Sequence, residues 1–331
     1  MQKEENPRAF VRTKLPWILT GVALAVFLLT LNTWVNLRSL PVVAKITGWD
    51  WSLPIQYPLL FLVTYPISWL PATIQPLAAN VLTAIFAALT LGLLARSVAI
   101  LPHDRTHEQR QRERSEFSML SIPLAWVPPV LAVLVCGLQL TFWEHATSLT
   151  GEMLDLLVFA YLIRCLLEFR ISGKEMWLLK LAFVYGLGVT NNWALIAYFP
   201  FFLGALIWIK GVRFFEGRFL VKMLIVGVVG LLLYLLLPAI WAMKGNSDMT
   251  FLEVLRTNWI NQKMYLTARV LRNRALLVSL TCVLPVILMG FRWPSSFGDT
   301  SAAGANLTNI AFRVIHLFFL AAWLYVVFDP K

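Results

Sequence analysis

Nine long apolar runs, separated by short polar segments, constrain this chain more than any other feature of its sequence. An α-helix needs about 20 mostly apolar residues to cross the hydrocarbon core of a bilayer. The composition agrees, since 59% hydrophobic residues, 14% charged residues and a mean hydropathy of +0.72 exclude a water-soluble surface. We therefore predict an all-α, polytopic transmembrane helical bundle of about nine spans, forming a single integral membrane domain over residues 1–331. The runs lie near residues 15–37, 75–98, 119–141, 148–169, 177–192, 193–210, 220–243, 275–291 and 309–328.

The basic residues between these runs predict the orientation of the chain, because cytoplasmic loops carry an excess of lysine and arginine. Residues 1–14 are predicted to be a cytoplasmic tail, and residues 97–118 a basic cytoplasmic loop. Residues 35–74 then form the first outer loop, and residues 244–274 a second outer loop. The net charge of +11 is thus explained by topology and not by a nucleic-acid partner. We expect a multi-pass protein of a bacterial inner (plasma) membrane, with membrane lipids as partners.

The apolar stretch from Pro54 to Leu70 is an exception among the runs. If it crossed the membrane, the basic segment from Arg96 to Arg114 would lie outside, against the positive-inside rule. Its prolines also remove backbone donors that lipid cannot replace. We predict an interfacial or re-entrant helix in the first outer loop.

Carboxylates collect at the predicted outer end of the fourth run. Glu152 and Asp155 are three residues apart and therefore share a helix face, close to Trp143 and His145 in the preceding turn. Carboxylates at a membrane are costly, which favours a functional role. Alternatively, they favour the helix N-terminus through its dipole or pair with an outer basic residue. Further along the same helix, an ion pair between Arg164 and Glu168 is the simpler interpretation of that spacing.

The first outer loop contains one further candidate, Asp50, which lies between two tryptophans. In a partly desolvated pocket it could act as a general base, but it could equally be an interfacial turn residue. The three cysteines show no metal-ligand or CxxC spacing, so we predict no metal site and no cofactor.

The 244–274 loop contains an amphipathic pattern that predicts a helix on the membrane surface. Arg256 and Lys263 lie off its apolar stripe and could bind lipid head groups or the phosphate of a lipid-linked substrate; simple interfacial anchoring is the alternative. The stripe consists of Leu252, Leu255, Trp259, Leu266 and Val270.

Several short motifs, in order along residues 15–270, resemble a known family. Tyr57-Pro58-Leu59 resembles a proline-rich "PPGYPL" element, and Asn80 with Ala84, Ala87 and Ala88 resembles the small-residue helix that follows it in that family. Thr141-Phe142-Trp143 with Ala146 matches an "FW..A" element, and Glu152 stands at the place of a following glutamate.

Further along, Gly186 to Asn192 resembles a "GL..TNH" turn that includes Asn191, and the basic helix from Phe251 to Tyr265 resembles an outer segment of the same family. Together these motifs resemble the domain of unknown function 2723, which is similar to protein O-mannosyltransferases and belongs to the C-type (GT-C) glycosyltransferases. The chain departs from this pattern at Val35 to Ser39, where the family has an acidic "GD.GE" element, at Asn192, where it has histidine, and at Ile55-Gln56, which replace Pro-Gly.

The resemblance implies an enzyme that transfers a sugar, for example mannose, from a polyprenyl-phosphate donor to a protein or lipid hydroxyl on the outer face. The lipid-linked donor would be the substrate, and no separate cofactor is implied. Such a reaction needs a carboxylate to accept the hydroxyl proton and cationic groups to steady the departing phosphate. Asp50 and Glu152 are the catalytic candidates. The substrate-binding candidates are Tyr57, Trp143, His145, Asp155, Asn191, Asn192, Arg256 and Lys263.

Two other functions stay open on the sequence alone. A transporter or flippase of a lipid-linked molecule would favour ionisable residues near the bilayer midplane, whereas the carboxylates here are predicted at the outer ends. A catalytically inactive membrane assembly subunit is the second alternative, because the first-loop acidic element is missing. A structure without an outer cavity near Asp50 and Glu152 would favour that subunit.

Overall fold

The structure, a computed structural model, describes residues 7–50, 54–100, 125–243, 249–270 and 317. All secondary structure among these residues is helical, as predicted, and no strand occurs in them. Most of the predicted basic loop 97–118 and the predicted runs 275–291 and 309–328 lie outside the described residues. The chain divides into two compact units, Met1–Pro54 with Leu59–Trp177 and Ile55–Pro58 with Leu178–Lys331. Each is described separately below.

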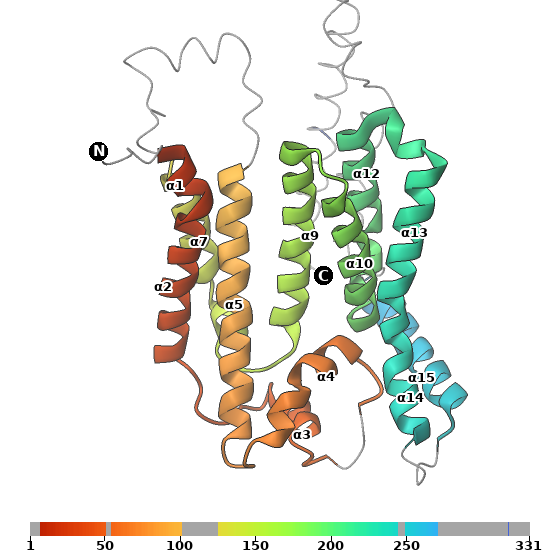
Figure 1. Ribbon diagram of the computed structural model, residues 1–331. Coiled ribbons are helices and arrows are strands. Elements are labelled where there is room, and N and C mark those ends of the chain that lie inside the picture. The colour runs from red at the N-terminus through yellow and green to blue at the C-terminus, as the bar shows by residue number, and fades with distance from the viewer. Residues whose placement is uncertain (1–6, 51–53, 101–124, 244–248, 271–316, 318–331) are drawn as a thin grey trace, which may run out of the picture. The chain divides into compact units, whose positions relative to one another are not determined.

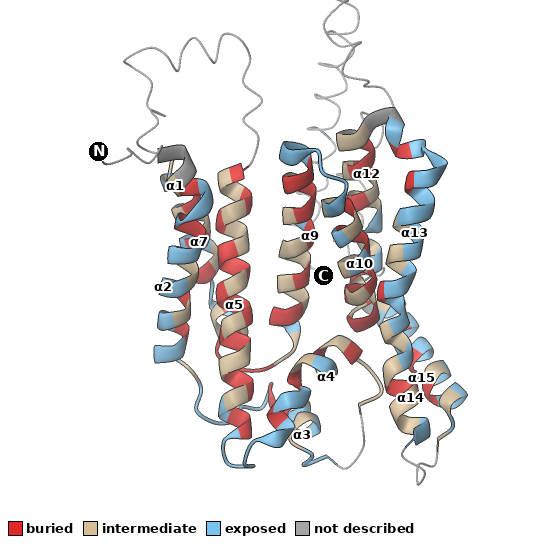
Figure 2. Ribbon diagram, viewed as in Figure 1, coloured by how far each residue is buried: buried red, intermediate tan, exposed pale blue. Residues whose placement is uncertain are grey.

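The first unit is organised around α5 (Gln75–Ile100), which packs against α2, α7 and α9 (Figure 1). Small residues on α5 make this close packing possible, because Ala79, Ala84, Ala87 and Ala95 are fully buried. Buried positions run along α5 and α9 in Figure 2. The other helices of this unit are α1 (Pro7–Thr13), α2 (Leu15–Leu29), α3 (Leu40–Ile46), α4 (Pro58–Thr64), η1 (Tyr65–Trp69), α7 (Val127–Gly137), α8 (Leu140–Ala146) and α9 (Glu152–Ser172).

A buried ion pair joins α5 to α9. The carboxylate of Glu168 lies 2.9 Å from Nη2 of Arg96, while its distance to Nε of Arg164 is 3.6 Å. The predicted pair between Arg164 and Glu168 is therefore present, but Glu168 lies closer to Arg96, a residue of another helix. A carboxylate this deeply buried needs such partners, because an isolated charge in a protein interior is strongly unfavourable.

The helices that could cross a membrane are fewer than predicted. Among the described residues, α5 and the continuous helix Gly217–Met243 are long and apolar enough, and α7 with α8 would be a third span, bent by 76°. This corrects the prediction of about nine spans. The helix α2 has 15 residues, fewer than the roughly 20 that a span needs. In addition, α9 carries five charged residues, namely Glu152, Asp155, Arg164, Glu168 and Arg170.

These apolar helices indicate that the protein associates with a membrane. The cytoplasmic N-terminus and the division into inner and outer loops stay predictions. The short helix predicted near residues 54–70 is present as α4 and η1, which together span Pro58–Trp69 and are too short to cross a bilayer. Whether it lies at the interface also stays a prediction.

The second unit contains a close helix contact between α10 (Met176–Asn191) and α13 (Gly217–Leu231). A Cβ atom on Gly230 would lie 2.3 Å from the carbonyl oxygen of Phe183, so only glycine fits there. The unit also contains α11 (Ala194–Ala197), α12 (Phe199–Lys210), η3 (Gly211–Phe215), η4 (Leu232–Leu235), α14 (Leu236–Met243), α15 (Phe251–Tyr265) and the π-helical turn η5 (Leu266–Val270).

The amphipathic helix predicted in the 244–274 loop is α15, which lies beside α14 (Figure 1). It begins with a capping box, in which Thr250 and Glu253 satisfy each other's backbone N–H groups. Two residues of the predicted apolar stripe are exposed, with 71% of Leu252 and 56% of Trp259 accessible, while Leu255 and Leu266 are half-buried. The protein instead packs against a different face, formed by Val254, Asn258 and Gln262.

Candidate functional site

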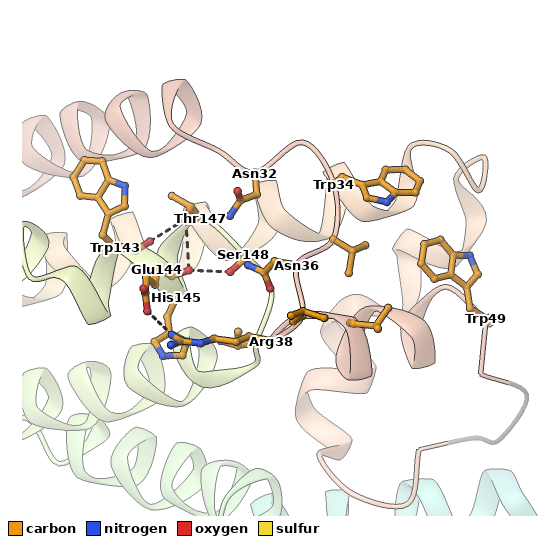
Figure 3. Close-up of a pocket in the computed structure, with 14 residues that line it drawn as sticks. Asn32, Trp34, Asn36, Arg38, Trp49, Trp143, Glu144, His145, Thr147 and Ser148 are labelled. Carbon is orange, nitrogen blue, oxygen red and sulfur yellow. Dashed lines mark hydrogen bonds and ion pairs between the residues drawn. The ribbon is translucent and has the colours of Figure 1, made fainter.

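The first unit contains an open pocket of about 770 Å³ (Figure 3). Its walls come from the connection that follows α2, from Trp49 after α3, and from α8 with the turn that leads into α9. Small-molecule sites have volumes of roughly 300–1,000 Å³ and combine aromatic side chains with a few polar groups, as here. The residues that line it are Asn32, Trp34, Val35, Asn36, Leu37, Arg38, Leu40, Trp49, Trp143, Glu144, His145, Thr147, Ser148 and Thr150.

Asn80, a buried residue of α5, holds two walls of this pocket together. Its side-chain nitrogen donates to the carbonyl oxygens of Asn32 (2.8 Å) and Trp34 (2.9 Å). Its side-chain oxygen accepts a hydrogen bond from the N–H of Leu149 (2.9 Å). The N–H of Asn32 donates in turn to the carbonyl oxygen of Thr147. Buried peptide groups need such partners, so one amide side chain fixes the relative position of both walls.

Arg38 and Glu144 form an ion pair at the pocket (Figure 3). A local turn holds the arginine in place, because the side chain of Asn36 accepts from the N–H of Ser39 (2.8 Å), and that of Ser39 accepts from the N–H of Asn36 (3.0 Å). Both charged side chains are accessible, at 65% for Arg38 and 41% for Glu144. The pair can therefore separate at little energetic cost when an anionic ligand approaches.

His145 is held through both of its ring nitrogens. Nδ1 lies 2.8 Å from the hydroxyl oxygen of Thr150, and Nε2 lies 2.9 Å from the carboxylate of Glu152. Glu152 is the first residue of α9, and it reaches His145 because Gly151 turns the chain with φ of 88°, a conformation that favours glycine. His145 and Thr150 both line the pocket, and Glu152 contacts His145 from the first turn of α9.

Aromatic side chains give the pocket its apolar surface. The ring of Trp143 packs edge-on against Phe27 of α2, with centroids 5.4 Å apart. The rings of Trp34 and Trp49 lie with their centroids 6.0 Å apart (Figure 3 shows both). Flat, rigid rings of this kind offer a large contact area to a ligand at low conformational entropy.

The structure places three predicted site residues together. Trp143 and His145 line the pocket, and Glu152 contacts His145. Asp155 follows on the first turn of the same helix. The sequence left open whether Glu152 is functional or only favours the helix N-terminus; its contact with a pocket residue is compatible with both.

Asp50 does not belong to the described residues that line the pocket, although its neighbour Trp49 does. Its backbone N–H donates to the carbonyl oxygen of Ala44 (2.9 Å), and the residue is exposed in the bend after α3. Asp50 therefore lies in a turn, and its position at a membrane interface stays a prediction. The catalytic role of Asp50 stays a prediction.

The remaining predicted site residues belong to the second unit. Tyr57 has an unusual positive φ of 64°. Asn191, at the end of α10, is buried, and the side chain of Asn192 accepts from the N–H of Ala194 (2.9 Å). Arg256 and Lys263 are both exposed on α15.

Near them, the side chain of Gln262 donates to the carbonyl oxygen of Thr190 (3.3 Å) and accepts from the N–H of Trp193 (3.2 Å). These hydrogen bonds connect the end of α10 and the turn that follows it to α15.

Several residues that line the pocket were not among the site residues predicted from the sequence. They include Arg38, Glu144 and Thr150. Arg38 lies in the stretch where an acidic element was expected, and only the three-dimensional structure shows that it pairs with a glutamate 106 positions away. Glu144 gave a usable signal, because it stands beside His145 in the "FW..A" element. No group of three or more histidine, cysteine, aspartate or glutamate side chains that could hold a metal ion occurs in the described part of the chain.

Part of the chain matches a known protein family. The family model "Protein O-mannosyl-transferase TMEM260 N-terminal domain" matches residues 53–213, just under half of the chain. This range contains α8, His145, Thr150 and Glu152, but not the wall around Arg38. No curated protein and no solved structure matches the chain. Over residues 53–213 the chain is therefore similar to the N-terminal domain of protein O-mannosyl-transferase TMEM260, which supports an O-mannosyltransferase-like family.

Proposed function

We propose that this protein is a membrane glycosyltransferase of the GT-C type, which transfers a sugar from a polyprenyl-phosphate carrier to a hydroxyl group of a protein or lipid on the outer face. Mannose is the first sugar to test. The observation that carries the proposal is the pocket, which combines tryptophans, an arginine–carboxylate pair and a supported histidine. The similarity to an O-mannosyltransferase domain over residues 53–213 supports the same class of reaction.

The charges of the pocket suit a sugar phosphate. A phosphate carries negative charge that Arg38 can bind in a bidentate manner once it leaves Glu144. The tryptophan rings offer apolar faces to the sugar, and the polar side chains around them offer hydrogen bonds to its hydroxyl groups. The pocket is open, so that a carrier chain could remain outside it while its head group enters.

In the proposed reaction the oxygen of the acceptor hydroxyl attacks the anomeric carbon of the sugar. The bond from that carbon to the phosphate oxygen breaks, and its electron pair leaves with the phosphate on the carrier. The hydroxyl proton must pass to a base, which a carboxylate at the pocket can supply directly or through another group. Glu144 and Glu152 are the carboxylates nearest to this task, and Arg38 would steady the charge that develops on the phosphate.

The proposed roles of residues in the second unit rest on the sequence. Arg256 and Lys263 are exposed cations on a helix that also exposes Leu252 and Trp259, as expected of a segment that contacts lipid head groups. Tyr57, Asn191 and Asn192 are proposed to contact the donor or the acceptor.

Transfer of a labelled sugar from polyprenyl-phosphate donors, in membranes that contain the protein, tests this function. The parent protein should transfer label to an acceptor fraction, and Glu144→Gln and Glu152→Gln should each lower the initial rate at least about 10-fold. Asp50→Asn tests the third carboxylate. Glu216→Gln, an exposed change at the start of α13 in the other unit, is the matched control and should retain the parent rate.

The outcomes separate the proposed function from its alternatives. Absence of transfer by well-expressed parent protein from any polyprenyl-phosphate donor would contradict the enzyme. Movement of an intact lipid-linked sugar across the membrane without transfer would instead identify a flippase. If the protein neither transfers the sugar nor moves the lipid-linked sugar across the membrane, the inactive assembly subunit is the remaining function.

A further inference from the structure

The strongest unassigned feature of the pocket is the chain of contacts Thr150–His145–Glu152. An ionised carboxylate accepts hydrogen bonds and donates none. The 2.9 Å contact with Glu152 therefore places a proton on Nε2 of His145. In a neutral imidazole the other nitrogen, Nδ1, then carries the free electron pair. Nδ1 is the nitrogen that lies 2.8 Å from the hydroxyl of Thr150, which lines the pocket. The available base therefore faces the hydroxyl of a residue that lines the pocket.

We propose that His145 is the general base of the sugar transfer, that the hydroxyl of Thr150 passes the proton to it, and that Glu152 is a positioning residue acting through the imidazole. This inference rests on the proposed function and assigns the proton route within it. The acceptor hydroxyl gives its proton to the oxygen of Thr150, which gives its own proton to Nδ1. Glu152 stabilises the imidazolium that forms, and the proton is later released to water.

The fold supports this assignment over a direct role for Glu152. The Glu152 side chain is 64% exposed and does not belong to the described residues that line the pocket, whereas His145 is 21% exposed and does. The turn that carries Thr150 is also rigidly held, because Leu149 binds Asn80 and the side chain of Ser148 donates to the carbonyl oxygen of Glu144 (2.8 Å). A proton relay needs such fixed geometry, with each transfer within hydrogen-bond reach.

Three charged side chains lie around His145 or beside its neighbours. Among the described residues, Glu152 faces it from α9, Glu144 adjoins it on α8, and Arg38 approaches Glu144 from the connection after α2. An imidazole that must accept a proton cannot act once it is protonated, so transfer through His145 should be slower in acid.

The test is the initial rate of sugar transfer as a function of pH, in membranes that contain the full-length protein. The parent should show a rate that rises with pH. His145→Ala should lower the rate by about 100-fold or more and abolish that rise, with little change in the KM of the donor. Added imidazole should restore part of the rate, because the small base can enter the space that the side chain leaves.

The neighbouring variants separate a relay from a merely structural role. Thr150→Val, which removes the hydroxyl at nearly constant shape, should lower the rate at least about 10-fold, while Thr150→Ser should stay within about three-fold of the parent. Glu152→Gln should slow transfer, since the imidazolium that forms during the reaction loses the carboxylate that stabilises it. Glu216→Gln serves as the control.

The experiments distinguish a wrong proton relay from a wrong enzyme assignment. If the parent transfers sugar and His145→Ala keeps both the rate and the pH dependence, the relay is wrong while the enzyme stands. If Thr150→Val matches the parent, the proton does not pass through Thr150. If the parent transfers no sugar from any donor, the proposed function and the relay are both overturned.

Discussion

The side-chain carbonyl of Asn80 accepts a 2.9 Å hydrogen bond from the N–H of Leu149, a residue 69 positions later in the chain. Through its amide nitrogen the same side chain holds the carbonyl groups of Asn32 and Trp34. One residue of the central helix α5 thus defines the distance between the turn that bears Thr150 and the connection that bears Arg38. The pocket depends on this bridge.

Replacement of Asn80 by leucine should therefore damage the pocket more than the rest of the fold. The buried N–H of Leu149 would lose its partner, at a cost of about 1–3 kcal/mol for an unsatisfied buried group. We expect a lower melting temperature in detergent and loss of sugar transfer. Gln139→Leu, an exposed amide with no side-chain cap bond, is the control and should change neither. Equal melting temperatures for parent and Asn80→Leu would contradict the bridge.

Arg38→Gln should change function without changing stability. An accessible ion pair contributes about 0–1 kcal/mol, so loss of the contact with Glu144 should leave the melting temperature nearly unchanged. If Arg38 binds the donor phosphate, its loss should raise the donor KM about 10-fold or more, as charge-assisted hydrogen bonds of roughly 1.5–3 kcal/mol disappear. Steady-state kinetics with varied donor measure this. An unchanged KM would remove Arg38 from the donor site.

Two glycines of α13 provide a matched test of the helix contact in the second unit. Gly230→Ala would bring a methyl group to 2.3 Å from the carbonyl oxygen of Phe183, and backbone atoms cannot easily yield. Overpacking of this kind costs about 1–3 kcal/mol. Gly227→Ala should be neutral or slightly stabilising, because its nearest contact is at an ordinary 3.7 Å. Thermal unfolding of both variants measures the contrast, and an equal stability would show that the two helices do not pack this way.

The capping box of α15 should make the start of that helix sensitive to pH. The backbone N–H of Thr250 donates to Glu253 and lowers the pKa of this carboxyl, and the hydroxyl of Thr250 adds to the effect. Because the folded pKa lies below the unfolded one, the stabilisation is complete at neutral pH and is lost as the pH falls through the folded pKa.

Hydrogen exchange at residues 250–254 measures this sensitivity. The parent should be better protected than Glu253→Gln at neutral pH, and the two should converge in acid once intrinsic exchange rates are taken into account. A protection difference that persists after Glu253 is protonated would contradict the assignment.

Periodicity and hydropathy predicted the positions of helices, because a helix depends mainly on residues close to one another in the sequence. The helix predicted near residues 75–98 is α5, and the short helix near residues 54–70 is α4 with η1. The predicted number of membrane spans was too high. A count of apolar residues accepts α2 and α9 as spans, whereas α2 is too short and α9 carries too many charged residues. The amphipathic pattern of α15 gave the helix but not the face that the protein covers.

The site was harder to predict because its contacts connect distant positions. Glu144 pairs with Arg38 and Glu168 with Arg96, at separations of 106 and 72 residues. No local pattern contains such pairs. His145 and Glu152 could be recognised as candidates because only a short turn separates them, and the structure adds the contact between them and the hydroxyl of Thr150.

The most direct test of the central claim is the transfer of labelled sugar from a polyprenyl-phosphate donor by membranes containing the parent protein, compared with Glu152→Gln at equal protein level. We expect transfer by the parent and a rate at least about 10-fold lower in the variant. Equal transfer by both would exclude Glu152 from the reaction, and no transfer by folded parent protein would contradict the glycosyltransferase itself.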